Sequence, residues 1–152
     1  MFVIETTNQK ETLTVGEQLG KKAERGTVIC VDGDLGVGKT VLAQGIAKGL
    51  GVNEPVVSPT FTIVQEYHDG RIPFYHFDVY RIEDPDEMYE IGFEEYFYGD
   101  GVCMVEWSEL IAELLPPESI HITIRKDLKQ GPDHRMITIE GIEKSWLSDN
   151  HE

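Results

Sequence analysis

The sequence lacks the features that mark membrane proteins, secreted proteins and proteins built on disulfides. No apolar run approaches the roughly 20 residues of a transmembrane helix, and the first residues contain no basic segment followed by an apolar one. Cysteine occurs only twice, at Cys30 and Cys103, inside apolar runs that are typical of buried thiols. Neither has another cysteine or a histidine at the spacing of a metal site. We therefore expect a cytoplasmic protein with no membrane span, no secretion signal and no disulfide.

Basic residues are scarce as well. The chain has 13 lysines and arginines against 28 acidic residues, and its formal net charge is -15. Binding to nucleic acid depends on cations that neutralise phosphates, so we expect no direct nucleic-acid binding by this chain alone. If the protein serves nucleic-acid metabolism, another subunit should carry the basic surface. Solubility alone would also explain the excess of acid, and both interpretations stay open.

The residues that are present indicate a single α/β domain, residues 1–152. The chain is long enough to bury its own core, and no repeat, linker or low-complexity segment divides it. Capping signals at Asn8–Glu11 and Asp84–Glu87 predict two helix starts, and a further helix is expected at 109–115 before two prolines. Strands are expected at 2–4, 27–31, 61–67, 72–77, 102–105, 120–124 and 136–139.

The most informative stretch is 33–40, which reads Gly-Asp-Leu-Gly-Val-Gly-Lys-Thr. This is the G-x-x-x-x-G-K-T pattern of a phosphate-binding P-loop. Its glycines permit a tight turn that aims backbone N–H groups at an anion, and the next helix adds the positive end of its dipole. Lys39 can reach the outer phosphates, and the Thr40 hydroxyl can hold Mg²⁺. Strand 27–31 before the loop and the helical spacing of Val41, Leu42 and Ile46 after it argue against a chance match.

A P-loop enzyme also needs an acid at the end of a neighbouring strand to organise the metal. Glu106 follows the apolar run 102–105, and Asp78 ends the run 72–77. We assign Glu106 to Mg²⁺ and Asp78 to orienting or deprotonating the attacking water; the reverse assignment stays open. Asp78 and Lys39 are therefore the candidate catalytic residues.

Four other features allow two interpretations each. The segment 58–62, with hydroxyls around Pro59, is either a plain turn or a loop that senses the γ-phosphate. Trp107 either packs in the core or covers the nucleotide or a partner surface. Arg81 either stabilises transferred charge or pairs with a nearby carboxylate. For His76, a buried strand position is the expectation, ahead of a role as a ligand.

Four motifs together resemble the bacterial TsaE family: GDLGVGKT at 33–40, SPTFT at 58–62, HFDVYR at 76–81 and VEW at 105–107. The P-loop is shared by many proteins, whereas the other three at these separations are specific. The resemblance covers almost the whole chain. It implies a P-loop NTPase-like α/β sandwich, with a mixed, mainly parallel sheet flanked by helices. It also implies a Mg²⁺-dependent ATPase, slow alone, that serves the making of N6-threonylcarbamoyladenosine in tRNA.

The same resemblance implies partners and residue roles. The partners are TsaD-like and TsaB-like proteins, with ATP hydrolysis resetting the TsaD–TsaB pair between turnovers. Thr40 and Glu106 are implied to hold Mg²⁺, and Asp78 to be needed for hydrolysis. Thr60 belongs to a switch-like loop, and Trp107 lies near the nucleotide. The implied phosphate-binding residues, after Gly33 at the start of the loop, are Leu35, Gly36, Val37, Gly38, Lys39 and Thr40.

Two other functions compete with this interpretation. A small-molecule kinase of the P-loop class needs an acceptor pocket and usually a basic lid, but the five arginines are scattered along the chain. A regulatory module that binds nucleotide without turnover would have no need of two strand-end acids.

Overall fold

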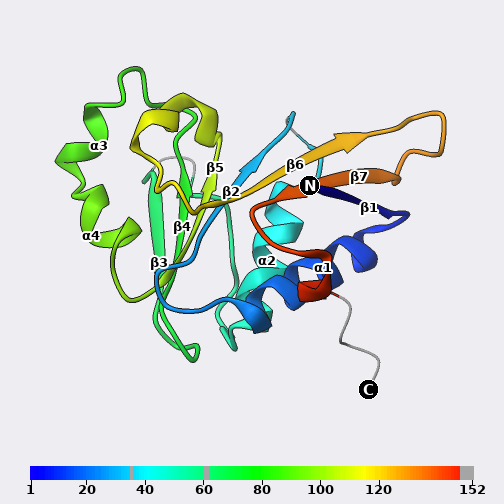
Figure 1. The fold of residues 1–152 in the computed structure, drawn as a ribbon, viewed down its shortest axis with the longest axis horizontal. Coiled ribbons are helices and arrows are strands. Elements are labelled where there is room, and N and C mark those ends of the chain that lie inside the picture. Colours follow the sequence, from blue (N-terminus) through cyan, green and yellow to red (C-terminus); the bar gives the residue numbers. More distant parts are fainter. Residues whose placement is uncertain (35, 60–61, 148–152) are drawn as a thin grey trace.

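A computed structural model describes residues 1–34, 36–59 and 62–147 (Figure 1). Its strands are β1 (Phe2–Thr6), β2 (Val28–Asp32), β3 (Val64–Tyr67), β4 (Phe74–Asp78), β5 (Val102–Glu106), β6 (Ile120–Lys126) and β7 (Arg135–Glu140). Its α-helices are α1 (Gln9–Lys22), α2 (Lys39–Gly49), α3 (Glu87–Glu90) and α4 (Phe93–Phe97), and its 3-10 helices are η1 (Ser108–Leu114) and η2 (Lys144–Leu147).

The strands form one seven-stranded sheet in the order β1-β7-β6-β2-β5-β4-β3. The neighbours β6, β2, β5 and β4 are parallel to one another. Strands β7 and β3 run antiparallel to their neighbours, so that five of the seven strands point the same way. The expected mixed, mainly parallel sheet is confirmed. Strand β5 is buried at every position, as central parallel strands covered on both faces require.

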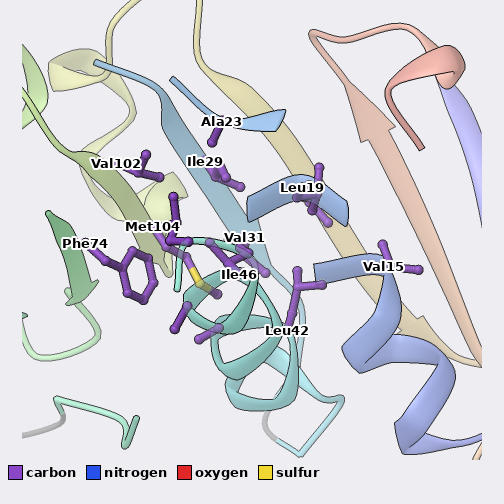
Figure 2. Close-up of a cluster of buried hydrophobic side chains, with 14 of the residues drawn as sticks. Val15, Leu19, Ala23, Ile29, Val31, Leu42, Ile46, Phe74, Val102 and Met104 are labelled. Carbon is purple, nitrogen blue, oxygen red and sulfur yellow. The ribbon is translucent and has the colours of Figure 1, made fainter. Parts of the chain in front are cut away.

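Two apolar cores lie on opposite faces of this sheet. Successive side chains of a strand point to opposite faces, so Ile29 and Val31 of β2 join the core under α1 and α2. Val28 and Cys30 join the second core, with side chains of α3, α4 and η1. Figure 2 shows the first core, in which Leu42 and Ile46 of α2 lie against the sheet. The protein is therefore a three-layer sandwich of helices, sheet and helices.

The register of the parallel strands decides where the functional residues meet. Glu106 pairs with Val31 across β5 and β2, and with Asp78 across β5 and β4. The carboxyl ends of β2, β5 and β4 therefore lie at one edge of the sheet. In open α/β sheets, this edge is where ligands bind.

Some predicted elements have different boundaries in the structure. The expected hairpin is present as β3 and β4, but β3 begins at Val64, after Ile63 with its φ of 68°. The helix expected from Asp84 is split into α3 and α4 at Gly92, which has a φ of 70°. The segment expected to form a helix at 109–115 is the kinked 3-10 helix η1, ended by the prolines.

Both cysteines are buried and unpaired, as the sequence predicted. Burial raises the pKa of the Cys30 thiol to about 12, and it also raises the pKa of Cys103 above its usual value. Both groups therefore stay protonated at neutral pH and behave as small apolar side chains. Of the helices in the described ranges, none has the length and apolar character needed to cross a bilayer.

Helices α1 and α2 pack backbone against backbone. A Cβ atom at Gly45 would lie 2.3 Å from the carbonyl oxygen of Leu13. One at Gly20 would lie 2.2 Å from that of Ile46. These distances are far below a van der Waals contact, so only glycine permits this approach, which seats the helix that follows the P-loop. The same holds for Gly16 and Gly49.

We therefore expect Gly45→Ala to lower the free energy of unfolding by about 1–3 kcal/mol, because the added methyl group forces α1 and α2 apart. Lys48→Ala, at an exposed position of the same helix, is the control and should change it little. Urea denaturation followed by circular dichroism measures both. Equal stability of Gly45→Ala and the wild type would show that the helices separate without cost.

Candidate functional site

The phosphate-loop motif forms the turn between β2 and α2. Gly33 has a φ of 146° and Gly38 a φ of 110°, both in the region that favours glycine. A Cβ at Gly33 would also lie 2.4 Å from the carbonyl oxygen of Ile124. Helix α2 starts at Lys39, directly after Gly38, whose lack of a side chain leaves the first N–H groups of the helix uncapped. Those groups, at the positive end of the helix dipole, are suited to an anion. Leu35 lies outside the described residues.

A cavity of about 430 Å³ opens at this helix start. It brings together the loop, the two strand-end acids and the tryptophan that the sequence analysis singled out. Its lining residues are Gln9, Gly36, Gly38, Lys39, Thr40, Val41, Ser58, Asp78, Tyr80, Arg81, Glu106 and Trp107. A second cavity, of about 210 Å³, lies at the opposite end of β2 and contains none of the candidate residues.

The Lys39 ammonium is almost fully buried within the loop, with 5% of the residue exposed. It donates a hydrogen bond to the Gly33 carbonyl oxygen at 2.5 Å. It also lies 3.9 Å from the centroid of the Trp107 ring, where a cation is attracted by the face of the indole. The cation is thus held at the cavity wall by a carbonyl and a ring, both of which are uncharged.

The two candidate carboxylates are buried side by side on β4 and β5, with Asp78 7% and Glu106 3% exposed. Asp78 accepts hydrogen bonds from the Ser58 hydroxyl at 3.2 Å and from the Tyr80 N–H at 3.0 Å. These two donors hold its carboxylate from the segment before β3 and from two residues beyond the end of β4. The Lys39 ammonium lines the same cavity.

Glu106 is bonded differently, to a histidine. Its Oε2 atom lies 2.5 Å from Nε2 of His76, which is completely buried on β4. His76 is a buried strand residue, as the sequence predicted, whereas its contact with Glu106 was not predicted. The alternation of side chains along the strand could have indicated this contact, because it requires His76 and Asp78 to lie on the same face of the sheet.

The side-chain oxygen atoms around the cavity are suited to binding a magnesium ion. The hydroxyl of Thr40 and the carboxylates of Glu106 and Asp78 are hard oxygen ligands, and Mg²⁺ commonly takes few protein ligands and keeps several waters. Within residues 1–34, 36–59 and 62–147, no group of three or more His, Cys, Asp or Glu side chains is arranged to hold a metal. A site of one hydroxyl and one or two carboxylates is in keeping with that finding.

Trp107 is half-buried, between the core and the cavity. It has a φ of 61°, a left-handed conformation that is rare outside glycine. Next to it, the Ser108 hydroxyl donates to Asp32 at 2.6 Å and ties the start of η1 to the end of β2. The indole lies 4.8 Å from the Tyr80 ring, measured between centroids. The ring therefore lines the cavity as well as packing against the second core.

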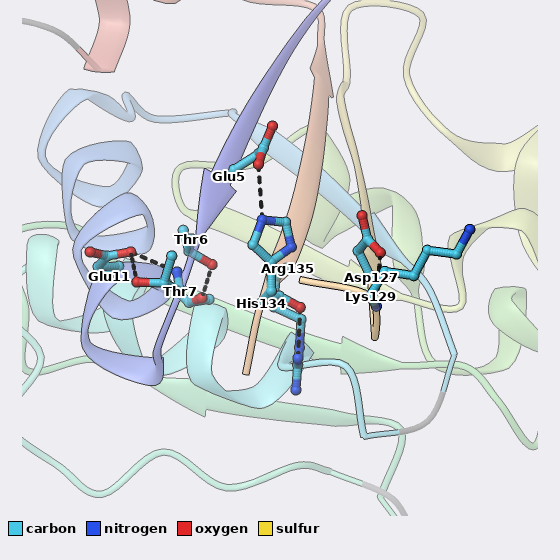
Figure 3. A network of polar contacts seen from close by, with 9 residues as sticks. Glu5, Thr6, Thr7, Glu11, Asp127, Lys129, His134 and Arg135 are labelled. Carbon is cyan, nitrogen blue, oxygen red and sulfur yellow. Dashed lines mark hydrogen bonds and ion pairs between the residues drawn. The ribbon is translucent and has the colours of Figure 1, made fainter. Parts of the chain in front are cut away.

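Several residues of the site had no role predicted from the sequence. Gln9 and Tyr80 line the cavity. Tyr80 lies within the motif at 76–81, but no role of its own was predicted for it, and helix capping was preferred over a contact with the nucleotide for the segment that ends at Gln9. Arg135, on β7, donates from Nε to the Val37 carbonyl oxygen at 2.8 Å and so braces the phosphate loop from the edge of the sheet. Figure 3 shows Arg135 beside His134, whose ring bonds Glu5 of β1. Thr60 lies outside the described residues.

The fold and the loop together define an α/β protein of the P-loop NTPase-like class. A family model described as "Threonylcarbamoyl adenosine biosynthesis protein TsaE" matches residues 6–137. The chain belongs to the TsaE family.

Individual relatives agree with this assignment. A Bacillus subtilis protein named tRNA threonylcarbamoyladenosine biosynthesis protein TsaE is 47% identical over 90% of this chain and 84% of its own length. A Treponema pallidum protein of the same name is 41% identical over 76% of this chain and 85% of its own length. The crystal structure of Bacillus subtilis YdiB superposes with a TM-score of 0.79 at 40% identity, covering 95% of this chain and 88% of that one.

Proposed function

We propose that the protein is the ATP-hydrolysing subunit of a tRNA threonylcarbamoyladenosine modification system and that it acts in the cytoplasm on a TsaD–TsaB pair. The observation that carries the proposal is a single cavity lined by Lys39, Thr40, Asp78 and Glu106. A cation, a hydroxyl and two carboxylates around the start of a helix are the groups that hydrolysis of a nucleoside triphosphate requires.

Each residue has a distinct task in this proposal. The backbone N–H groups of the loop and of the first turn of α2 receive the phosphate oxygens. Lys39 exchanges its bond to the Gly33 carbonyl for the outer phosphates. Thr40 and Glu106 hold Mg²⁺, which supplies neutralisation of the phosphate charge. Asp78 orients the attacking water and accepts its proton, and ADP and inorganic phosphate are the products.

The charge of the chain agrees with a dependence on partners. A protein of net charge -15 repels the phosphates of tRNA. We propose that tRNA is held by the partner subunits and that this chain docks against them through its acidic surface. ATP hydrolysis then resets the complex between turnovers.

Co-purification with TsaD and TsaB tests the partner assignment. We expect the tagged protein to retain the TsaD–TsaB pair in one nucleotide state more strongly than in the other, with ATP and ADP compared at equal concentration. We also expect the slow hydrolysis of the protein alone to change when the pair is added. Absence of association with either nucleotide would overturn the partner assignment. Transfer of phosphate to a metabolite, seen by mass spectrometry, would favour a kinase instead.

A further inference from the structure

The contact between His76 and Glu106 has properties that a simple packing role does not require. His76 is 0% exposed and does not line the cavity, whereas Glu106 does. The Phe74 ring stacks on the imidazole, with 6.1 Å between the ring centroids and 15° between the planes. A rigid donor held in this way fixes one oxygen of the Glu106 carboxylate, and with it the direction of the whole group.

The hydrogen-bond pattern assigns the form of the imidazole. Nε2 contacts a carboxylate oxygen, so it carries the hydrogen and donates. Nδ1 is buried and has no hydrogen-bond partner in the described part of the chain. A second N–H at that nitrogen would be a buried donor without an acceptor, which is costly. His76 therefore donates to Glu106 through Nε2.

The two oxygens of the Glu106 carboxylate differ in their hydrogen bonding. Among the described residues, Oε1 makes no hydrogen bond, while Oε2 is engaged by His76. One oxygen is thus anchored, and the other is left for a ligand in the cavity that Glu106 shares with Thr40. Carboxylates that bind metals are characteristically held in this way by a partner outside the ligand set.

We propose that His76 is a positioning residue that orients the Glu106 carboxylate for Mg²⁺ and thereby sets how strongly the metal promotes nucleotide binding. This inference rests on the proposed function. It differs from a structural role of His76 because it predicts an effect confined to the metal-dependent part of binding.

The test compares two variants, His76→Gln and His76→Asn, whose amide side chains differ in length by one methylene group. The Gln side chain can place its N–H₂ group near the position of Nε2, whereas that of Asn reaches only as far as Nδ1. Affinity for the non-hydrolysable ATP analogue AMP-PNP is measured by calorimetry for His76→Gln and His76→Asn, with Mg²⁺ and with EDTA. Thermal unfolding identifies the variants that are folded.

In wild-type protein we expect Mg²⁺ to strengthen AMP-PNP binding. In His76→Asn the strengthening should fall by about tenfold, with binding in EDTA unchanged, while His76→Gln should keep most of it. In a Glu106→Gln background, adding His76→Asn should not reduce the effect of Mg²⁺ on AMP-PNP affinity any further. Equal Mg²⁺ effects in folded His76→Asn and wild type would overturn the positioning role, and so would a further loss in the double variant. If the wild type instead binds AMP-PNP equally well with Mg²⁺ and with EDTA, the proposed metal site itself is overturned.

Discussion

Lys39→Ala is expected to lower ATP hydrolysis by at least about a hundredfold, because the variant loses the one cation that the loop presents to the outer phosphates. The expected loss of affinity for ATP is about tenfold or more, the usual consequence of removing a charged hydrogen-bond partner. Release of inorganic phosphate under single-turnover conditions measures the first effect, and calorimetry with AMP-PNP measures the second.

The structure supplies a matched control for this prediction. Lys48 lies on the same helix but is exposed and lines none of the cavities described above, so Lys48→Ala should hydrolyse ATP as the wild type does. Lys39 makes its contacts with an uncharged carbonyl and an indole ring, so its removal should leave the fold intact. Hydrolysis at the wild-type rate in folded Lys39→Ala would refute the assignment of the loop as the triphosphate site.

Asp78→Asn should abolish hydrolysis while sparing binding. Asparagine is almost isosteric and can still bond Ser58 and the Tyr80 N–H, but its amide cannot accept a proton from water. Loss of a general base typically costs about a hundred- to ten-thousandfold in rate. AMP-PNP affinity should stay within a few fold of the wild-type value. Asp86→Asn, an exposed position that makes no side-chain cap, is the control.

The two acids can also be told apart by the same measurements. If Glu106 holds the metal, Glu106→Gln should weaken the effect of Mg²⁺ on AMP-PNP binding and Asp78→Asn should not. The opposite pattern would reverse the two roles, an alternative that the sequence left open. The register places both carboxylates at neighbouring positions of the same sheet edge, so position alone does not separate the two roles. Their hydrogen-bond partners differ, however: a serine and a backbone N–H for Asp78, and a histidine for Glu106.

Much of the fold could be predicted because the signals are local. The apolar run 102–105 predicts a buried strand, and Asn8 predicts a helix start; its side chain does accept from the Glu11 N–H at 2.9 Å. The short segments were harder to predict. The residues from 84 to 97 divide at Gly92 into two short helices, because tertiary contacts outweigh helix propensity over so few residues.

The candidate site was predictable in its residue types but not in its bonding. The motif identifies Lys39 and Thr40 within one loop, and the apolar runs lead to Asp78 and Glu106. That Lys39 lies under the Trp107 ring, and that Arg135 braces the Val37 carbonyl, depends on segments far apart in the sequence. No periodicity or motif reports such contacts.

The sequence by itself determined that a glycine turn joins a buried strand to a helix, and that two acids end other strands, since backbone preferences and side-chain period act over a few residues. The tertiary structure alone decided that those acids meet at the turn and that His76 holds one of them. It also decided that α1 and α2 touch through glycine. These outcomes depend on strand order and register, which arise from the packing of the whole sheet and not from any one segment.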